Sequence, residues 1–394
     1  MAGLFLAGFL VIAGLTGAVI SWEHEIDEWL NPQLYRPASP GALLDPWELA
    51  RRVELADARV AVFSLPLSYG PEHAVDVFVE PRLDPAHGRR HAVDYNQVFI
   101  DPVSGEIAGR RMAGKPGLDR EHLMAFLYKL HHTLHMPAFF GIDKWGGWLL
   151  GAAGLLWMFD CVSGLILTLP ARGRAAPGKA AGRGWWSRWK VAWLIKADAG
   201  AYRRTLDLHR AFSLWLWGIL LVVAATSWTL NLSTELFRPL LASVSELTPD
   251  PFAERRPLPP AQRRAPALSF EQAVAVARDD AHERGWPEPP GSVFYASAYD
   301  LYCVEFFEGD ADHGAGPKRM CLDGSTGAVL ERRVPWEGTL ADTVVQLQFP
   351  LHSGRLFGTA GRIAISVCGV IVAMLSLTGA MLWLKRRSGK ARRG

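Results

Sequence analysis

The apolar positions of this chain gather in four runs of about twenty residues, the length that spans a hydrocarbon core of about 30 Å. The runs cover Gly3–Trp22, Trp145–Leu169, Leu214–Leu232 and Ile363–Leu384. Many tryptophans lie near the ends of these runs, where indole rings prefer the membrane interface. The pattern predicts a membrane protein built on an α-helical bundle of four transmembrane helices.

Two basic segments set the expected orientation of this bundle. Nine Lys or Arg and one acid, Asp198, occur between Arg172 and Arg204, and six Lys or Arg with no acid follow Leu384. Because loops rich in Lys and Arg stay in the cytoplasm, both segments are expected there. With four spans both termini are then cytoplasmic, and the two long polar segments lie in the periplasm of a bacterial inner membrane.

The first apolar run could be mistaken for a cleaved signal peptide. It has no basic region before it and no clean cleavage site after it. Its end, GLTGAVI (Gly14–Ile20), recurs as SLTGAML (Ser376–Leu382) in the last run. We therefore expect a retained helix.

The two outer segments show the same order of short elements. Each has one amphipathic stretch, Asp45–Asp57 or Ser269–Arg284, that predicts a helix, followed by β-like stretches. The turn region FIDPVSGEIAGRR of the first segment matches MCLDGSTGAVLERR of the second. The chain is therefore predicted to be an internal repeat, in which each copy has a small α+β module with its own antiparallel sheet and two spans.

These patterns predict the boundaries of nine segments. They are a transmembrane helix over 1–22, an outer module over 23–117, a histidine-containing interfacial helix over 118–144, a transmembrane helix over 145–169, a basic cytoplasmic loop with an interfacial helix over 170–206, a transmembrane helix over 207–232, a second outer module over 233–352, a transmembrane helix over 353–384 and a basic cytoplasmic tail over 385–394.

Histidines flank the spans and are the main candidates for chemistry. In LHHTLHMP (Leu130–Pro137), His131 and His135 are four residues apart and would share one face of a helix. His209 opens the third run and His352 precedes the fourth. An imidazole beside a membrane span is costly unless it faces a protein interior, where it usually serves a function. By depth, His131, His135 and His352 belong to the outer side and His209 to the inner side.

The four cysteines form no C-x-x-C pattern, so neither a zinc ribbon nor a covalently attached haem is indicated. Cys161 and Cys368 lie within apolar runs and are expected to pack as small apolar residues. Cys303 and Cys321 fall on neighbouring predicted strands of the second outer module, where an oxidising compartment would allow a disulfide. The sequence leaves that pairing open.

Several motifs together carry a family resemblance. They are LHHTLHMP, FDCVSGLILTLP, DLHRAFSLW, LHSGRLFGTAGR and LTGAMLWLKRR, and they extend over nearly the whole chain. This combination resembles the PepSY-associated transmembrane family, and the repeated outer turn is similar to that of PepSY modules. The resemblance implies a di-haem inner-membrane reductase that acts on ferric siderophores during iron uptake.

For this chain the resemblance implies b-type haem held by His131, His135, His209 and His352, with one haem near each side of the membrane. Two neutral imidazoles facing each other across an apolar slot are the ligand set of such a haem. The family's first helix usually begins with a His-Arg-Trp segment, whereas this chain begins Met1-Ala2-Gly3. The expected inner partner of His209 would fall before Met1.

Each of the other polar residues near the spans allows two interpretations. Asp160, inside the second run, could exchange a proton during electron transfer or be a neutral carboxyl bonded to Ser163. Arg355 and Arg362 could neutralise haem propionates or anchor to lipid headgroups.

Alternatives remain for the histidines as well. His24 is a weaker ligand candidate, and a zinc site at His131 and His135 is the rival for that pair. Protease chemistry is not indicated, because the glutamate of H-E-x-x-H is missing. The remaining histidines are expected at the surface; they are His73, His87, His91, His122, His282 and His313.

No G-x-G-x-x-G follows a predicted strand, and the inner loop is too short for a nucleotide-binding domain. Electrons would therefore come from membrane quinol or a partner and pass to a ferric siderophore or chelate, with no role for nucleic acid. The alternative is a non-catalytic membrane-anchored module that binds a peptide or protease, or assists siderophore import without redox chemistry.

Overall fold

The structure is a computed structural model that describes residues 2–36, 39–171, 184–259, 262–263, 265–309, 314 and 316–391. The linker over 172–183, His313, Arg392 and Arg393 of the sequence predictions lie outside these residues. The chain forms two compact units. We call residues 1–22, 127–239 and 347–394 the helical unit, and residues 23–126 and 240–346 the sheet unit.

Within its described residues, the helical unit contains three helices long and apolar enough to cross a membrane, over Gly3–Ile20, Trp145–Thr168 and Arg355–Arg387. The helices that belong wholly or in part to this unit are α1 (Ala2–Ile20), α5 (Leu123–Thr133), α6 (Trp145–Thr168), α7 (Trp185–Trp189), η1 (Lys190–Trp193), α8 (Ala201–Trp215), α9 (Trp217–Asn231), η2 (Ser233–Phe237), α10 (Arg238–Ala242), α13 (Leu340–Ser353), η4 (Arg355–Phe357) and α14 (Gly358–Ala391).

The predicted third span is not one straight helix. It is divided between α8 and α9, which meet at Leu216 with a bend of 73° and count as a fourth span if the bent pair is one crossing. Ser213 donates its hydroxyl to the carbonyl of His209, a local bond that bends helices. The indole of Trp217 donates to the carbonyl of Cys161 on α6, which holds the chain just after the break.

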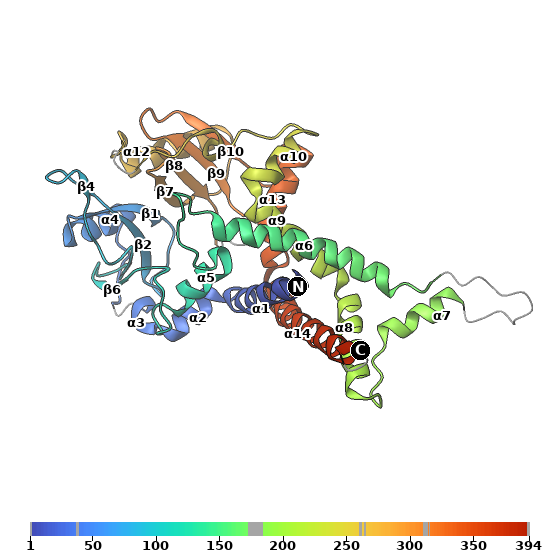
Figure 1. The fold of residues 1–394 in the computed structure, drawn as a ribbon. Helices are drawn as coiled ribbons and strands as arrows, with labels where there is room; N and C mark the ends of the chain where they lie inside the picture. The colour runs from blue at the N-terminus through green and yellow to red at the C-terminus, as the bar shows by residue number, and fades with distance from the viewer. Residues whose placement is uncertain are drawn as a thin grey trace, which may run out of the picture. The chain divides into compact units, whose positions relative to one another are not determined.

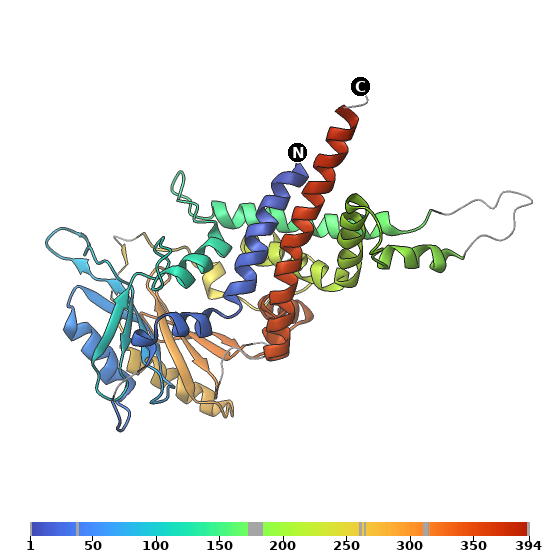
Figure 2. The same cartoon turned by 90° about the horizontal axis from the view of Figure 1, so that it is seen from below.

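Helices α1 and α14 pack side by side, as Figure 2 shows in blue and red. Their closest approach is at two glycines. A Cβ at Gly369 would lie 2.4 Å from the carbonyl oxygen of Gly14, and a Cβ at Gly14 would lie 2.5 Å from that of Gly369. Small residues at a helix crossing allow this backbone contact, as is usual within membranes. Helices α6 and α9 form the second close pair.

The sheet unit is built on one antiparallel sheet of eight strands (Figure 1). Its strands are β1 (Val60–Pro66), β2 (Val75–Pro81), β5 (Gln97–Ile100), β6 (Ile107–Arg111), β7 (Pro290–Ala296), β8 (Leu301–Phe306), β9 (Lys318–Asp323) and β10 (Val329–Arg333), and β3 (Leu83–Asp84) and β4 (Arg89–Arg90) form a separate small pair. The order is β10-β9-β8-β7-β1-β2-β5-β6.

All the predicted strands form, but the expectation of two separate sheets is wrong. Strand β1 pairs with β7 through Ser64–Phe294, Leu65–Val293 and Pro66–Ser292. Each half alone would leave its first strand as an edge with unpaired backbone groups, and joining the halves removes both edges. The four strands on each side of this seam follow the same order.

Two helices cover one face of this sheet. They are α4 (Pro46–Ala56) and α12 (Phe270–Glu283), and both place buried side chains in the single main core cluster, such as Leu49 and Ala277. Each helix begins at a capping residue, because Asp45 accepts from the Trp47 amide and Ser269 forms a capping box with Gln272.

The opposite face near β5 and β6 is covered by α2 (Glu23–Leu30) and α3 (Pro32–Tyr35). Here a buried ion pair joins Asp27 to Arg111, with Nη2 and Oδ2 2.6 Å apart. The Tyr35 hydroxyl donates to the same carboxylate at 2.5 Å. The pair is almost closed to solvent, since 4% of the Asp27 side chain and 6% of the Arg111 side chain are exposed.

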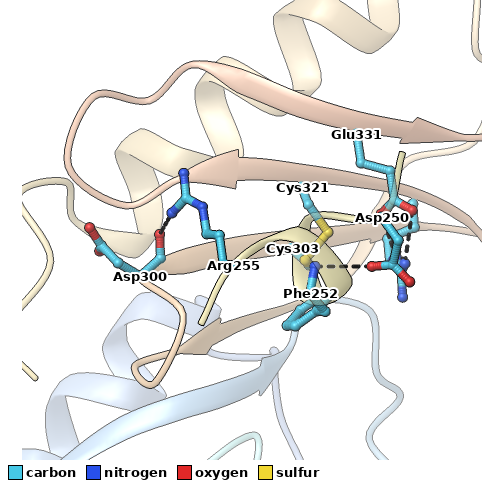
Figure 3. Close-up of a disulfide and its surroundings, with 8 residues drawn as sticks. Asp250, Phe252, Arg255, Asp300, Cys303, Cys321 and Glu331 are labelled. Carbon is cyan, nitrogen blue, oxygen red and sulfur yellow. Dashed lines mark hydrogen bonds and ion pairs between the residues drawn. A yellow bond between two sulfur atoms is a disulfide. The ribbon is translucent and has the colours of Figure 1, made fainter. Parts of the chain in front are cut away.

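The disulfide that the sequence left open is formed. Cys303 on β8 and Cys321 on β9 are directly opposite each other and joined through their sulfur atoms (Figure 3). Both residues are fully buried. The short helix α11 (Pro251–Glu254) begins beside them, where Asp250 accepts from the Phe252 amide.

Candidate functional site

Two of the candidate histidines meet inside the helical unit. His131 lies in the last turns of α5 and His352 in the last turn of α13, and their ring centres are 6.3 Å apart. Both rings are partly buried. The structure therefore brings together two imidazoles from segments that are far apart in the chain.

Each of these rings is held by a threonine on another helix. Nδ1 of His131 lies 2.9 Å from the hydroxyl of Thr16 on α1. Nδ1 of His352 lies 3.0 Å from the hydroxyl of Thr226 on α9. Because both bonds use Nδ1, the other ring nitrogen, Nε2, is left for a further partner.

The surroundings keep both imidazoles neutral. Removal from solvent lowers the pKa of His131 to about 3, and the neighbouring His352 adds to this effect. Removal from solvent also lowers the pKa of His352 to about 4, with His132 contributing. A neutral imidazole can offer a lone pair to a metal ion, whereas an imidazolium cannot.

The third candidate, His209, lies on α8 with a similar arrangement. Its Nδ1 is 3.0 Å from the hydroxyl of Thr378 on α14. The carboxylate of Asp160 on α6 is near enough to interact with this imidazole electrostatically. Asp160 itself is exposed, and the Ser163 hydroxyl donates to its backbone carbonyl rather than to its carboxyl group.

The structure does not place His135 as the sequence predicted. Helix α5 ends at Thr133, and Leu134 and His135 have left-handed backbones with φ of 54° and 50°. Residues close to Pro137 are poor continuations of a helix, so the expected helical face that carries both His131 and His135 is not formed. The neighbouring His132 is exposed and bonds the backbone carbonyl of Tyr128.

The remaining candidates lie elsewhere. His24 belongs to the sheet unit, where its ring contacts those of Tyr35 and His73. Arg362 donates to the carbonyl of Ser21 at 2.6 Å and lies over the ring of Trp22, so it ties the start of α14 to the end of α1. Arg355 lies over the ring of Phe349.

The sheet unit holds a cavity of about 280 Å³ lined by residues such as Gln262, Ser297 and Asp300. The Asp300 carboxylate accepts hydrogen bonds from Tyr295 and Ser325. Each of these two bonds goes to a different oxygen of the carboxylate.

The donor set at His131 and His352 fits an iron porphyrin. Two imidazoles that share one metal ion at metal–nitrogen distances of about 2 Å have ring centres about 6 Å apart, close to the 6.3 Å found here. Among the described residues, no group of three or more His, Cys, Asp or Glu is arranged to hold a metal ion. A pair of histidines can serve as the axial ligand set of b-type haem.

The family model of the PepSY-associated TM region matches residues 1–386. The chain belongs to this family. No curated protein matches the chain. Membership in the PepSY-associated TM family agrees with the long apolar helices of the helical unit, and the protein is a membrane protein.

The three threonines are the residues that sequence reasoning missed in this PepSY-associated TM protein. Thr16 and Thr378 occupy the same place in the repeated motifs GLTGAVI and SLTGAML. The repeat was visible in the sequence, but nothing in it shows that each threonine faces a histidine of another helix. Thr226 lies in no such motif.

Proposed function

We propose that this protein is a b-type haem protein of the bacterial inner membrane that carries electrons outward to a ferric siderophore or another ferric chelate. The observation that carries the proposal is the pair of neutral imidazoles, His131 and His352, at a separation that suits one iron ion. When bound, haem iron supplies one-electron transfer by alternating between its ferric and ferrous states.

We assign the following roles to the residues as part of this proposal. His131 and His352 hold the outer haem, and His209 supplies a ligand to an inner haem. Arg355 and Arg362 lie at the start of the last span, beside the His352 end of α13, where their positive charges suit haem carboxylates. We propose that Asp160, a carboxylate on α6 near enough to His209 to interact electrostatically, exchanges a proton during electron transfer.

The pairing of β1 with β7 supports four spans. These strands come from the segments before α6 and after α9, so both segments must lie on one side of the membrane. An even number of crossings must therefore separate them. Helix α6 supplies one crossing, and the bent pair α8 and α9 supplies the second only if it counts as one span.

The disulfide supports the orientation. Structural disulfides persist in the periplasm and are rare in the cytoplasm. The bond between Cys303 and Cys321 lies in the sheet unit, so we assign that unit to the periplasm. The basic loop before α8 and the tail after Leu384 are then cytoplasmic, as the positive-inside rule requires.

The test is spectroscopic. The protein is purified in detergent from haem-replete cells, and its dithionite-reduced spectrum is compared with its oxidised spectrum. We expect Soret and α bands of b-type haem, and oxidation of the reduced protein by a ferric siderophore. A colourless preparation would contradict the proposal and favour a non-catalytic module that binds a peptide or protease.

Single variants then locate the haem. His131→Ala and His352→Ala should remove the same share of the bound haem, because we propose that these two rings, whose centres are 6.3 Å apart, hold one haem. His209→Ala should remove a different share. His132→Ala is the matched control, since this exposed neighbour bonds its own helix and should leave the haem content unchanged. A double variant of His209→Ala with His352→Ala that loses no more haem than either single variant would argue against two haem sites.

A further inference from the structure

Three histidines on three helices are bonded in the same way to threonines of three other helices. The pairs are His131 with Thr16, His352 with Thr226 and His209 with Thr378, and in each case the ring atom is Nδ1. The Nδ1 to hydroxyl distances are 2.9, 3.0 and 3.0 Å. The direction of these bonds decides which nitrogen of each histidine carries the proton.

The threonines cannot be the donors in these bonds. Each hydroxyl already donates to the backbone carbonyl four residues earlier, namely Ile12, Val222 and Met374, at 2.7, 2.8 and 2.9 Å. A hydroxyl has one hydrogen and two lone pairs, so the threonine oxygen must accept from the histidine. Nδ1 therefore carries the hydrogen in all three rings.

The place of the lone pair follows from the position of this hydrogen, because a neutral imidazole has one N–H and one acceptor nitrogen. With Nδ1 protonated, the lone pair of each neutral ring is on Nε2.

Glycine completes two of the three arrangements. Gly17 and Gly379 follow Thr16 and Thr378 directly, and a Cβ at these positions would lie 3.0 and 3.3 Å from Cε1 of His131 and His209. The ring edge therefore rests on the glycine while Nδ1 faces the threonine. This explains why the sequence Leu-Thr-Gly-Ala occurs in both the first and the last span.

We propose that Thr16, Thr226 and Thr378 are positioning residues that fix the three histidines as Nδ1–H tautomers and present Nε2 as the haem ligand. The inference rests on the proposed function and extends it to residues that do not touch the metal. A partner that accepts the second ring proton orients a ligating histidine and raises its basicity. A more basic ligand stabilises ferric iron, so these threonines also lower the reduction potential.

The experiment compares Thr226→Val, Thr226→Ser and Thr229→Val in the full-length protein. Thr229 is the matched control, because it lies on the same helix and bonds Gln348 rather than a histidine. We expect Thr226→Val to weaken haem binding at the outer site by about 10- to 100-fold and to raise the midpoint potential of the remaining haem. Thr226→Ser should restore both values, and Thr229→Val should change neither.

Thr16→Val should affect the same haem as Thr226→Val, and Thr378→Val the other one. Nitrogen-15 NMR of histidine-labelled, haem-free protein shows directly which ring nitrogen carries the hydrogen. Because this measurement needs no haem, it tests the tautomers independently of the proposed function. Nδ1–H signals that are lost in the valine variants support the proposal even in a colourless protein. Nε2–H tautomers in the wild type, or an unchanged potential in a haem-loaded Thr226→Val variant, would overturn it.

Discussion

The buried guanidinium of Arg111 in the sheet unit forms its ion pair with Asp27. Arg111 donates two hydrogen bonds to the Asp27 carboxylate, at 3.0 and 2.6 Å, and a third to Gln97 at 2.7 Å. Surface pairs such as Glu48 with Arg51 are open to water and screened by salt. Loss of the buried pair should therefore lower the stability of the sheet unit, whereas loss of a surface pair should not.

We expect Asp27→Ala to destabilise the sheet unit by about 3–5 kcal/mol, because it leaves the Arg111 guanidinium buried without a counter-charge. The measurement is thermal unfolding of the purified protein in detergent. Glu48→Ala is the control and should leave the unfolding temperature unchanged. Equal unfolding temperatures for the Asp27 variant and the wild type would show that the pair does not hold α2 against the sheet.

The sequence predicted the candidate histidines better than it predicted which side chains face each other across helices. His131, His209 and His352 stand out because imidazoles beside apolar runs are costly, and this can be read from the sequence. The threonines that hold them do not stand out, since a threonine within a span usually bonds its own helix. Whether its hydroxyl also faces a neighbouring histidine depends on how each helix is rotated, which a single sequence does not report.

At the scale of elements, the contact between α1 and α14 brings the first and last spans together. The contact needs Gly14 on α1 and Gly369 on α14. The backbone carbonyl oxygen of each glycine lies where a Cβ of the other would be, so a larger residue at either position would clash. Thr16 and Thr378 lie on these two helices, so their packing sets the positions of two histidine partners. A change at the crossing should therefore reach the proposed haem sites.

We expect Gly369→Leu to separate α1 from α14 and to lower both the unfolding temperature and the haem content. Overpacking a well-packed contact typically costs about 1–3 kcal/mol. Gly8→Leu is the matched control, because a Cβ at Gly8 has nothing within 4 Å. The readouts are thermal unfolding and the haem absorbance per protein. An unchanged haem content in the Gly369 variant would show that this crossing does not govern the histidine sites.

The sequence predicted which segments form helices or strands more readily than it predicted whether a helix is continuous. The apolar runs of α1, α6 and α14 correspond to single long helices, and the predicted strands all form. The break at Leu216 has no Pro or other strong sequence marker, and it depends on bonds such as that from Trp217 to Cys161. Contacts of this kind are made between helices and are invisible in a hydropathy pattern.

At the scale of the whole molecule, the disulfide reports the compartment in which the sheet unit folds. We expect the bond between Cys303 and Cys321 to be present in isolated membranes and detectable by mass spectrometry of unreduced peptides. The double variant Cys303→Ser with Cys321→Ser should lose about 2–4 kcal/mol of stability. Cys161→Ala, which removes a free cysteine, is the control. Fully reduced cysteines in fresh membranes would contradict a periplasmic sheet unit.

The seam between β1 and β7 also constrains how the protein is made. In the proposed topology, β1 emerges outside the membrane before its partner β7 has been synthesised, and helices α6, α8 and α9 would be inserted in between. Pairing of strands so distant in the chain is slow, and an unpaired edge is prone to aggregate in the meantime. The early half of the sheet is thus exposed during biogenesis, and a periplasmic chaperone that shields strand edges would have its natural substrate there.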